Sequence, residues 1–294
     1  MAGGLFIILD DIAAMFDDVA LMSKVAAKKT AALLGDDLAV NAEKATGFHA
    51  SRELPVIWAI TKGSFINKLI ILPIAFLLST YTPWLIVPVL LVGGGYLSYE
   101  GVEKIYEWIT GNASKRVTAR TFSNSDEMLQ HETVKIKAAI RTDFILSLEI
   151  VFIALETVMQ QSLPVQVMVV GFIALLATVG VYGVVALMVR MDDAGIHLIE
   201  RAGSIKSLTA NAQRYSGKVL VASLPELIRL LSVVGTIAML LVGGGMYVHN
   251  IAVVHSVLQG IPSMLASLLV GVLIGAVLLL LRQLSGLLMR KNAV

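Results

Sequence analysis

Residues 164–189, PVQVMVVGFIALLATVGVYGVVALMV, form a long apolar run without one charged side chain. A helix of this length, rising about 1.5 Å per residue, would cross the roughly 30 Å of hydrocarbon in a bilayer. Five further runs have a similar character, and they lie at 65–81, 84–100, 142–160, 226–246 and 264–283. The sequence therefore predicts an all-α, polytopic membrane protein with about six transmembrane helices.

The overall composition agrees with this class. Hydrophobic residues make up 57% and charged residues 15% of the 294 residues, and the mean hydropathy is +0.82. These values lie outside the range of soluble globular domains. The net charge of +2, without a basic stripe, argues against a nucleic-acid partner. The absence of cysteine excludes thiol catalysis, thiolate metal sites and disulfides.

The positions of the basic residues predict the topology. The connections around Thr82, at 160–164 and at 247–263 contain no Lys or Arg. Because positive charge is retained on the cytoplasmic side, both termini are predicted to be cytoplasmic. Three basic residues inside or beside the spans are expected to snorkel toward a membrane edge, namely Lys68, Arg229 and Arg282.

The polar stretches divide the chain into two parts. Residues 1–62 are expected to form cytoplasmic or membrane-peripheral amphipathic helices. Residues 63–294 would form the helical membrane domain, with cytoplasmic loops near 101–141 and 190–223.

Two glycine-rich segments suggest an internal repeat. LLVGGGYLSY (90–99) and LLVGGGMYVH (240–249) begin with six identical residues and end spans that run in opposite directions. A three-plus-three inverted repeat, common in secondary transporters, would produce this pattern. The similarity could equally arise by chance, or the chain could contain a same-orientation repeat that pairs Leu9-Asp10-Asp11 and Leu54-Pro55 with Met191-Asp192-Asp193 and Leu224-Pro225. The triplets themselves are expected to be sites of close helix packing or bending, at Gly93, Gly94, Gly95, Gly243, Gly244 and Gly245.

Carboxylates in the third span are the sharpest functional signal. Glu149 falls near the middle of the span, Glu156 follows one heptad later on the same face, and Asp143 lies near the cytoplasmic end. A charge at the bilayer centre costs about 2.5–3.5 kcal/mol, so Glu149 should face the bundle interior. It would either exchange protons or bind a cation, with Asp143 and Arg229 as polar partners, or be held by a neighbouring helix or by Arg229 in a structural role.

Further acidic residues lie outside the spans. Four of them project into an arc of about 120° on one helix, namely Asp10, Asp11, Asp17 and Asp18. This stripe either faces water or basic partners such as Lys24, Lys28 and Arg190, or forms an accessory cation site. The pair Asp192 and Asp193 has the same two interpretations, with Arg190 or Arg201 as the residue that it would neutralise. No metal-ligand spacing, cofactor motif or set of catalytic residues is recognisable, so no enzyme is predicted.

Three segments carry a resemblance to a known family. VALMSKVAAKKTAALLGDDLAVNAEKATG (19–47), SRELPVIWAITKGSFINKLIILP (51–73) and IRTDFILSLEI (140–150) resemble the YedI-like bacterial inner-membrane proteins, which have no assigned activity. The resemblance covers nearly the whole chain. It implies a multi-pass fold in the bacterial inner membrane and supplies no substrate, cofactor or site residue.

Two functional hypotheses follow from these observations. The first is a proton- or cation-coupled secondary transporter of unidentified substrate, with Glu149 as the titrating group. The second is a non-catalytic membrane scaffold whose cytoplasmic helices bind another component. The expected partners are the lipid bilayer, a proton or cation, and a second copy of the chain in a homo-oligomer. Gly271 and Gly275 form a GxxxG pattern, which fits either a helix contact or a dimer face.

Overall fold

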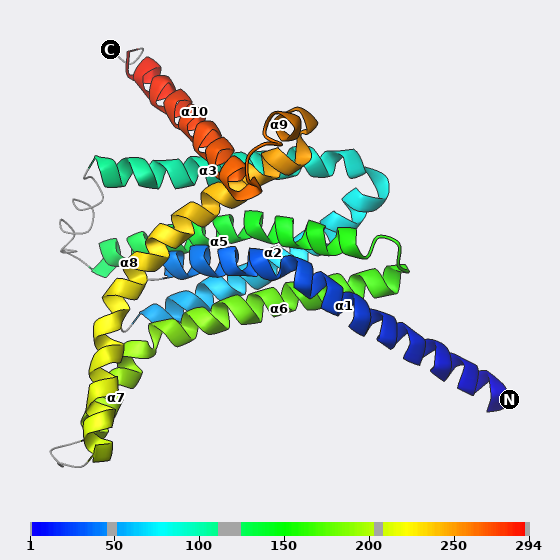
Figure 1. Cartoon of the computed structure of the whole chain (residues 1–294), viewed down its shortest axis with the longest axis horizontal. Helices are drawn as coiled ribbons and strands as arrows, with labels where there is room; N and C mark the ends of the chain where they lie inside the picture. The colour runs from blue at the N-terminus through cyan, green and yellow to red at the C-terminus, as the bar shows by residue number, and fades with distance from the viewer. Residues whose placement is uncertain (1, 46–51, 111–124, 203–207, 292–294) are drawn as a thin grey trace.

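The computed structural model describes residues 2–45, 52–110, 125–202 and 208–291, and these residues form helices without a strand (Figure 1). This confirms the all-α prediction. The elements in chain order are α1 (Ala2–Ala45), α2 (Glu53–Tyr81), the 3₁₀ turn η1 (Pro83–Leu85), α3 (Ile86–Ile109), α5 (Ser125–Thr157), α6 (Leu163–Val189), α7 (Met191–Ala202), α8 (Leu208–Asn250), α9 (Ala252–Val257) and α10 (Ser263–Lys291).

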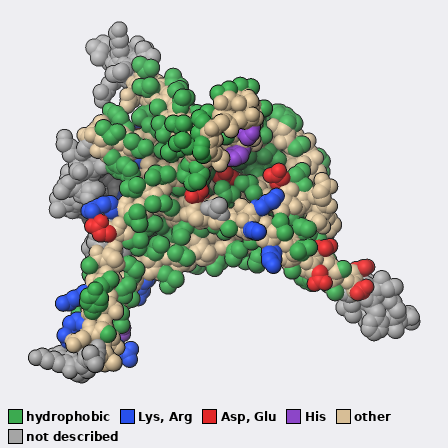
Figure 2. Space-filling model, in the orientation of Figure 1, with side chains coloured by type: hydrophobic (Ala, Val, Ile, Leu, Met, Phe, Trp, Pro, Cys, Tyr) green, Lys and Arg blue, Asp and Glu red, His purple; other side chains and the backbone are tan. Residues whose placement is uncertain are grey.

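Within the described ranges, five helical segments are long and apolar enough to cross a membrane, namely Glu53–Tyr81, Pro83–Ile109, Leu163–Val189, Glu226–Asn250 and Ser263–Ser285. Their outer faces are apolar: Leu69, Val179 and Leu273 expose 55%, 63% and 65% of their surfaces. Figure 2 shows hydrophobic side chains over much of the visible surface. A surface of this kind is stable against lipid and not against water.

The predicted third span, 142–160, lies in α5, which is not among these five segments. It carries three carboxylates, Asp143, Glu149 and Glu156. In Figure 1 α5 nevertheless runs through the bundle antiparallel to α6. The sixth crossing therefore stays a prediction.

Short turns join α2 to α3 and α5 to α6 and make each pair of helices antiparallel (Figure 1). The backbone N–H of Thr82 donates to the carbonyl of Leu78 at 2.9 Å and ends α2, and Pro83 opens the turn into α3. Pro164 stands in the first turn of α6, where its missing N–H has no cost. We call the end of the bundle that contains the turns at Thr82 and at 158–162 the hairpin end. The opposite end, which contains Thr110 and α7, is the loop end (Figure 1).

Helix α1 differs from the sequence expectation. It was expected to lie at the membrane surface or in the cytoplasm, yet its second half packs between α5, α6 and α8. Val40 and Ala42 are fully buried and Asn41 is 1% exposed. Hydropathy placed this segment outside because it counts each charge as a cost and does not count the partners that other helices provide.

The ends of the chain also differ from the expectation. In Figure 1 the N-terminal end of α1 projects from the hairpin end, whereas the C-terminal end of α10 points toward the loop end. This arrangement gives no support to the prediction that both termini lie on one side.

Glycines bring α3, α8 and α10 into close contact. A Cβ on Gly94 would lie 2.7 Å from the carbonyl oxygen of Gly243, and one on Gly271 would meet the backbone of Leu240. Both triplets lie inside continuous helices, so they are packing positions and not unwound hinges. The neighbours of Gly271 and Gly275 belong to the same chain. The inverted repeat itself stays a prediction.

Candidate functional site

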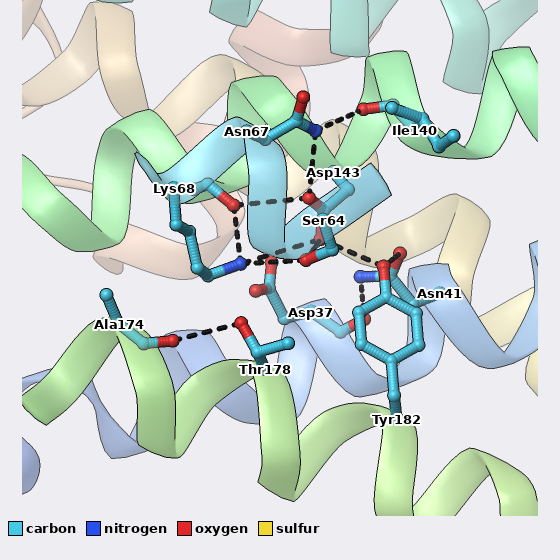
Figure 3. Close-up of polar contacts among 11 residues, drawn as sticks. Asp37, Asn41, Ser64, Asn67, Lys68, Ile140, Asp143, Ala174, Thr178 and Tyr182 are labelled. Atoms are coloured by element: carbon cyan, nitrogen blue, oxygen red, sulfur yellow. Dashed lines mark hydrogen bonds and ion pairs between the residues drawn. The ribbon is translucent and has the colours of Figure 1, made fainter. Parts of the chain in front are cut away.

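A buried ion pair lies near the centre of the bundle (Figure 3). Lys68 of α2 and Asp143 of α5 are 4% and 1% exposed, and Lys68 Nζ lies 3.7 Å from Asp143 Oδ1. Ser64, Asn67 and Lys68 share one face of α2 because positions three and four apart are neighbours on a helix. This face of α2 is turned toward Asp143 on α5 (Figure 3).

Hydrogen bonds surround both charges. The Ser64 hydroxyl donates to Asp143 Oδ1 at 2.8 Å, and Asn67 Nδ2 donates to Asp143 Oδ2 at 3.1 Å. Lys68 Nζ donates to Ser64 Oγ at 3.0 Å and to Ser147 Oγ at 2.8 Å. These partners offset much of the cost of removing a carboxylate and an ammonium group from water.

Tyr182 of α6 connects this pair to α1. Its hydroxyl oxygen lies 2.9 Å from Asn41 Oδ1 and 2.9 Å from Asp143 Oδ1. Only one hydroxyl proton is available, so Tyr182 can donate to one of these two acceptors at a time. Asp37, one turn before Asn41, is 3% exposed and interacts electrostatically with Lys68 and Asp143. We call Asp37, Ser64, Lys68, Asp143, Ser147 and Tyr182 the buried polar centre.

A cavity of about 740 Å³ lies at the hairpin end between α1, α2, α3, α5 and α8. Most of its lining is apolar, but two carboxylates from α5, Glu149 and Glu156, line it as well. Glu149 is half-buried and interacts electrostatically with Asp36 and Asp37, whereas Glu156 is exposed. Glu149 therefore stands between the cavity and the buried polar centre.

Ion pairs gather toward the loop end. Lys44 of α1 pairs with Glu100 of α3, and Lys104 of α3 pairs with Glu43 of α1. The Thr142 hydroxyl donates to Glu100 Oε2 at 3.1 Å, which joins α5 to this group. A smaller cavity of about 290 Å³ lies beside it, with Glu43, Lys44 and Lys104 in its wall.

The polar groups of α1 follow one another between the two cavities. Lys29 lines the hairpin-end cavity, Asp37 belongs to the buried polar centre, and Lys44 lines the loop-end cavity. Lys29 and Lys44 are 15 positions apart, which corresponds to a helical rise of about 22 Å. Charged and polar side chains therefore follow α1 through most of the thickness of the bundle.

The helices that carry the buried polar centre and the two cavities all lie within the part of the chain that matches one protein-family model. The chain matches, from residue 3 to residue 289, the family model described as Protein of unknown function (DUF808). The chain belongs to the DUF808 family. No curated protein and no solved structure matches it significantly. The DUF808 match includes α1 together with the other helices of the bundle, so α1 is part of the family fold.

Two of the three predicted transport residues of this DUF808 chain lie inside the bundle, and Asp143 is closer to its centre than the position near the cytoplasmic end that the sequence predicts. Asp143 is in the buried polar centre and Glu149 lines the hairpin-end cavity. The third, Arg229, requires a correction. Its side chain is 74% exposed and pairs at 3.0 Å with Glu226 of the same helix, because this part of α8 turns it outward. It cannot serve as the partner of Glu149.

The accessory acidic residues lie apart from both cavities. Asp10, Asp11, Asp17 and Asp18 are exposed on the first half of α1. Asp193 pairs with Arg190 at 2.9 Å, with both side chains more than half exposed, and Asp192 is half-buried beside it at the start of α7. Asp193 thus neutralises Arg190, whereas the accessory cation site at the acidic residues stays a prediction.

Sequence reasoning missed most of the buried polar centre. Lys68 was expected to snorkel to a membrane edge, but it is almost fully buried and bonded to α5. One signal was available: Ser64, Asn67 and Lys68 recur at helical spacing on one face of a span, where apolar residues are expected. Within the described ranges, no group of three or more His, Asp or Glu side chains is arranged to hold a metal ion.

Proposed function

We propose that this DUF808 chain is a proton- or cation-coupled secondary transporter of the bacterial inner membrane. The observation that carries the proposal is the buried polar centre, in which Lys68 and Asp143 lie between two cavities at opposite ends of the bundle. We also propose that the chain is a YedI-like protein and that the segments around its two glycine triplets form an inverted repeat.

The energetics of burial favour a transport role for the centre over a purely structural one. Apolar residues of similar volume would often be as stable as a buried ion pair, or more stable. Ionisable side chains inside membrane bundles therefore mark pathways for ions and protons by default. The alternation of carboxylate, hydroxyl and ammonium groups in the centre suits proton transfer or the coordination of a small cation by oxygen atoms.

The side chains have distinct roles in this proposal. Asp143 is the central proton- or cation-binding carboxylate, and Lys68 is the positive charge that balances it when it is empty. Glu149 exchanges protons between the hairpin-end cavity and Asp37. Tyr182 responds to the state of Asp143, because its hydroxyl can donate to Asn41 when Asp143 no longer accepts.

The test is proton and cation flux in proteoliposomes of the purified protein. The wild type should dissipate an imposed pH gradient, or exchange protons for one ion of a monovalent and divalent panel. Asp143→Asn and Glu149→Gln should each abolish this flux, because neither amide can take up or release a proton at neutral pH. Asp193→Asn, which removes an exposed carboxylate, should leave the flux unchanged.

A scaffold is the second candidate, and the exposed stripe of Asp10, Asp11, Asp17 and Asp18 on α1 favours it. Absence of flux in the wild type under every gradient, with a correctly folded protein, would overturn the transporter and leave the scaffold. If the wild type shows flux and replacement of all four aspartates by asparagine leaves it unchanged, transport does not require the stripe.

A further inference from the structure

We infer that the hairpin-end cavity binds amphipathic organic cations, that is, molecules with an ammonium or similar cationic group on an apolar body. The inference rests on the proposed function in one respect: if the protein is a transporter, these molecules are its substrate. The binding itself follows from the size, wall and charge of the cavity.

The size of the cavity fits an organic molecule. At about 740 Å³ it lies within the class of small-molecule pockets, roughly 300–1,000 Å³. A proton or a metal ion would leave most of this space unused. Five α-helices and the turn η1 contribute to the wall, so its shape is set by the packing of the bundle and not by one mobile loop.

The wall selects an apolar body. Leu90 of α3, Phe152 and Ile153 of α5 and Met246 of α8 belong to the lining. Methionine adapts to varied ligand shapes, and Phe152 offers a ring to a cation or to an apolar group. A strongly hydrated, fully polar solute would lose its water here without replacement contacts.

The charge of the cavity selects a cation. Its lining has two carboxylates, Glu149 and Glu156, against one ammonium group, that of Lys29. Lys29 is exposed. His249 is held near the mouth by donation from its Nδ1 to the carbonyl oxygen of Gly245, at 2.8 Å.

Glu149 is the carboxylate that the ligand would meet. Among the residues that the structure describes, Glu149 forms no ion pair and its carboxylate accepts no hydrogen bond. The nearby groups on α1 that act on it electrostatically, Asp36 and Asp37, are carboxyl groups as well and supply no positive charge. A cationic group at this position would therefore supply the counter-charge that the fold leaves out, while an anion would be repelled.

The test compares two probes of the same shape and opposite charge, tetraphenylphosphonium and tetraphenylborate, by equilibrium dialysis against the purified full chain in a neutral detergent. The wild type should bind the phosphonium saturably, at about one per chain, and should not bind the borate beyond the detergent background. Glu149→Gln should weaken phosphonium binding by at least about tenfold, since it removes the charge that the ligand pairs with. Asp193→Asn should bind like the wild type.

A second, steric variant tests the cavity independently, in case Glu149→Gln does not fold. Val87 lines the cavity and is half-buried, so Val87→Trp should fill the space and weaken phosphonium binding without removing a charge. Equal binding of both probes, or binding that neither variant changes, would overturn the inference.

The two proposals fail in different ways. Proton flux in proteoliposomes without phosphonium binding would refute the cavity as an organic-cation site and leave the transporter. Phosphonium binding that depends on Glu149, without any flux, would refute the transporter and leave the cavity as a binding site.

Discussion

Lys68 and Asp143 depend on each other, because each supplies the charge that makes burial of the other tolerable. Lys68→Met should therefore lower the free energy of unfolding by about 3–5 kcal/mol, since it leaves the Asp143 carboxylate without its counter-charge. Thermal or chemical unfolding of the purified protein in detergent would measure this loss.

The double variant Lys68→Met/Asp143→Leu should recover part of the loss, because it removes both charges. The exposed pair Arg190–Asp193 is the matched control, and Arg190→Met should cost less than about 1 kcal/mol. A loss for Lys68→Met as small as that of the control would show that the buried pair is not formed.

Tyr182 gives a second prediction for a single residue. Tyr182→Phe keeps the ring and removes the hydroxyl that reaches Asn41 and Asp143. We expect a loss of stability of about 1–3 kcal/mol, since the buried acceptor to which Tyr182 donates loses its donor, and slower flux in proteoliposomes. Tyr215→Phe, at a position that is 73% exposed, should change neither measurement. Equal effects of both substitutions would mean that the Tyr182 hydroxyl has no special role.

At the scale of the helices, substitutions in the glycine triplets test whether these glycines serve close helix packing or helix bending. A Cβ on Gly244 would collide with the backbone of Ser267 and Gly271, whereas one on Gly245 would lie 3.6 Å from its nearest neighbour. Backbone cannot move aside as a side chain does, so Gly244→Ala should lower the stability by about 1–3 kcal/mol and Gly245→Ala should be tolerated. The fraction of protein that stays monodisperse after heating, measured by size-exclusion chromatography, distinguishes the two. A hinge would predict similar effects at both positions.

The helices also show which features a sequence can predict. Long apolar runs specify spans by length and hydropathy alone, so five of the six predicted spans coincide with apolar helices of the structure. Asp143 and Glu149 could be chosen as site residues because an ionisable side chain inside an apolar span can be recognised without knowledge of its partner. Helix α1 could not be placed this way. Its burial depends on Lys68, Glu100 and Lys104, which lie on other helices and far away in sequence.

For the whole molecule, the course of α1 predicts a topology. The N-terminal part of α1 projects from the hairpin end, so Ala13 and Ser162 should lie on one side of the membrane and Tyr215 of α8 on the other (Figure 1). The chain has no cysteine, so single cysteines can be introduced at these positions without a background. A membrane-impermeant maleimide added to intact cells should label Ala13→Cys and Ser162→Cys alike and leave Tyr215→Cys unlabelled.

The unsubstituted protein, which has no thiol, is the control for this labelling. Labelling of Ser162→Cys alone, with Ala13→Cys and Tyr215→Cys both unlabelled, would restore the topology with both termini on the cytoplasmic side and contradict the passage of α1 through the bundle.

The buried half of α1 has a consequence for how the protein is made. Seven charged residues lie between Lys24 and Lys44, and each would cost about 2.5–3.5 kcal/mol at the centre of a bilayer if α1 were inserted alone. Its counter-charges lie on α2 and α3, which are synthesised later. Helix α1 must therefore stay at the membrane surface until these helices have formed the bundle, so the insertion of α1 is a late step of assembly.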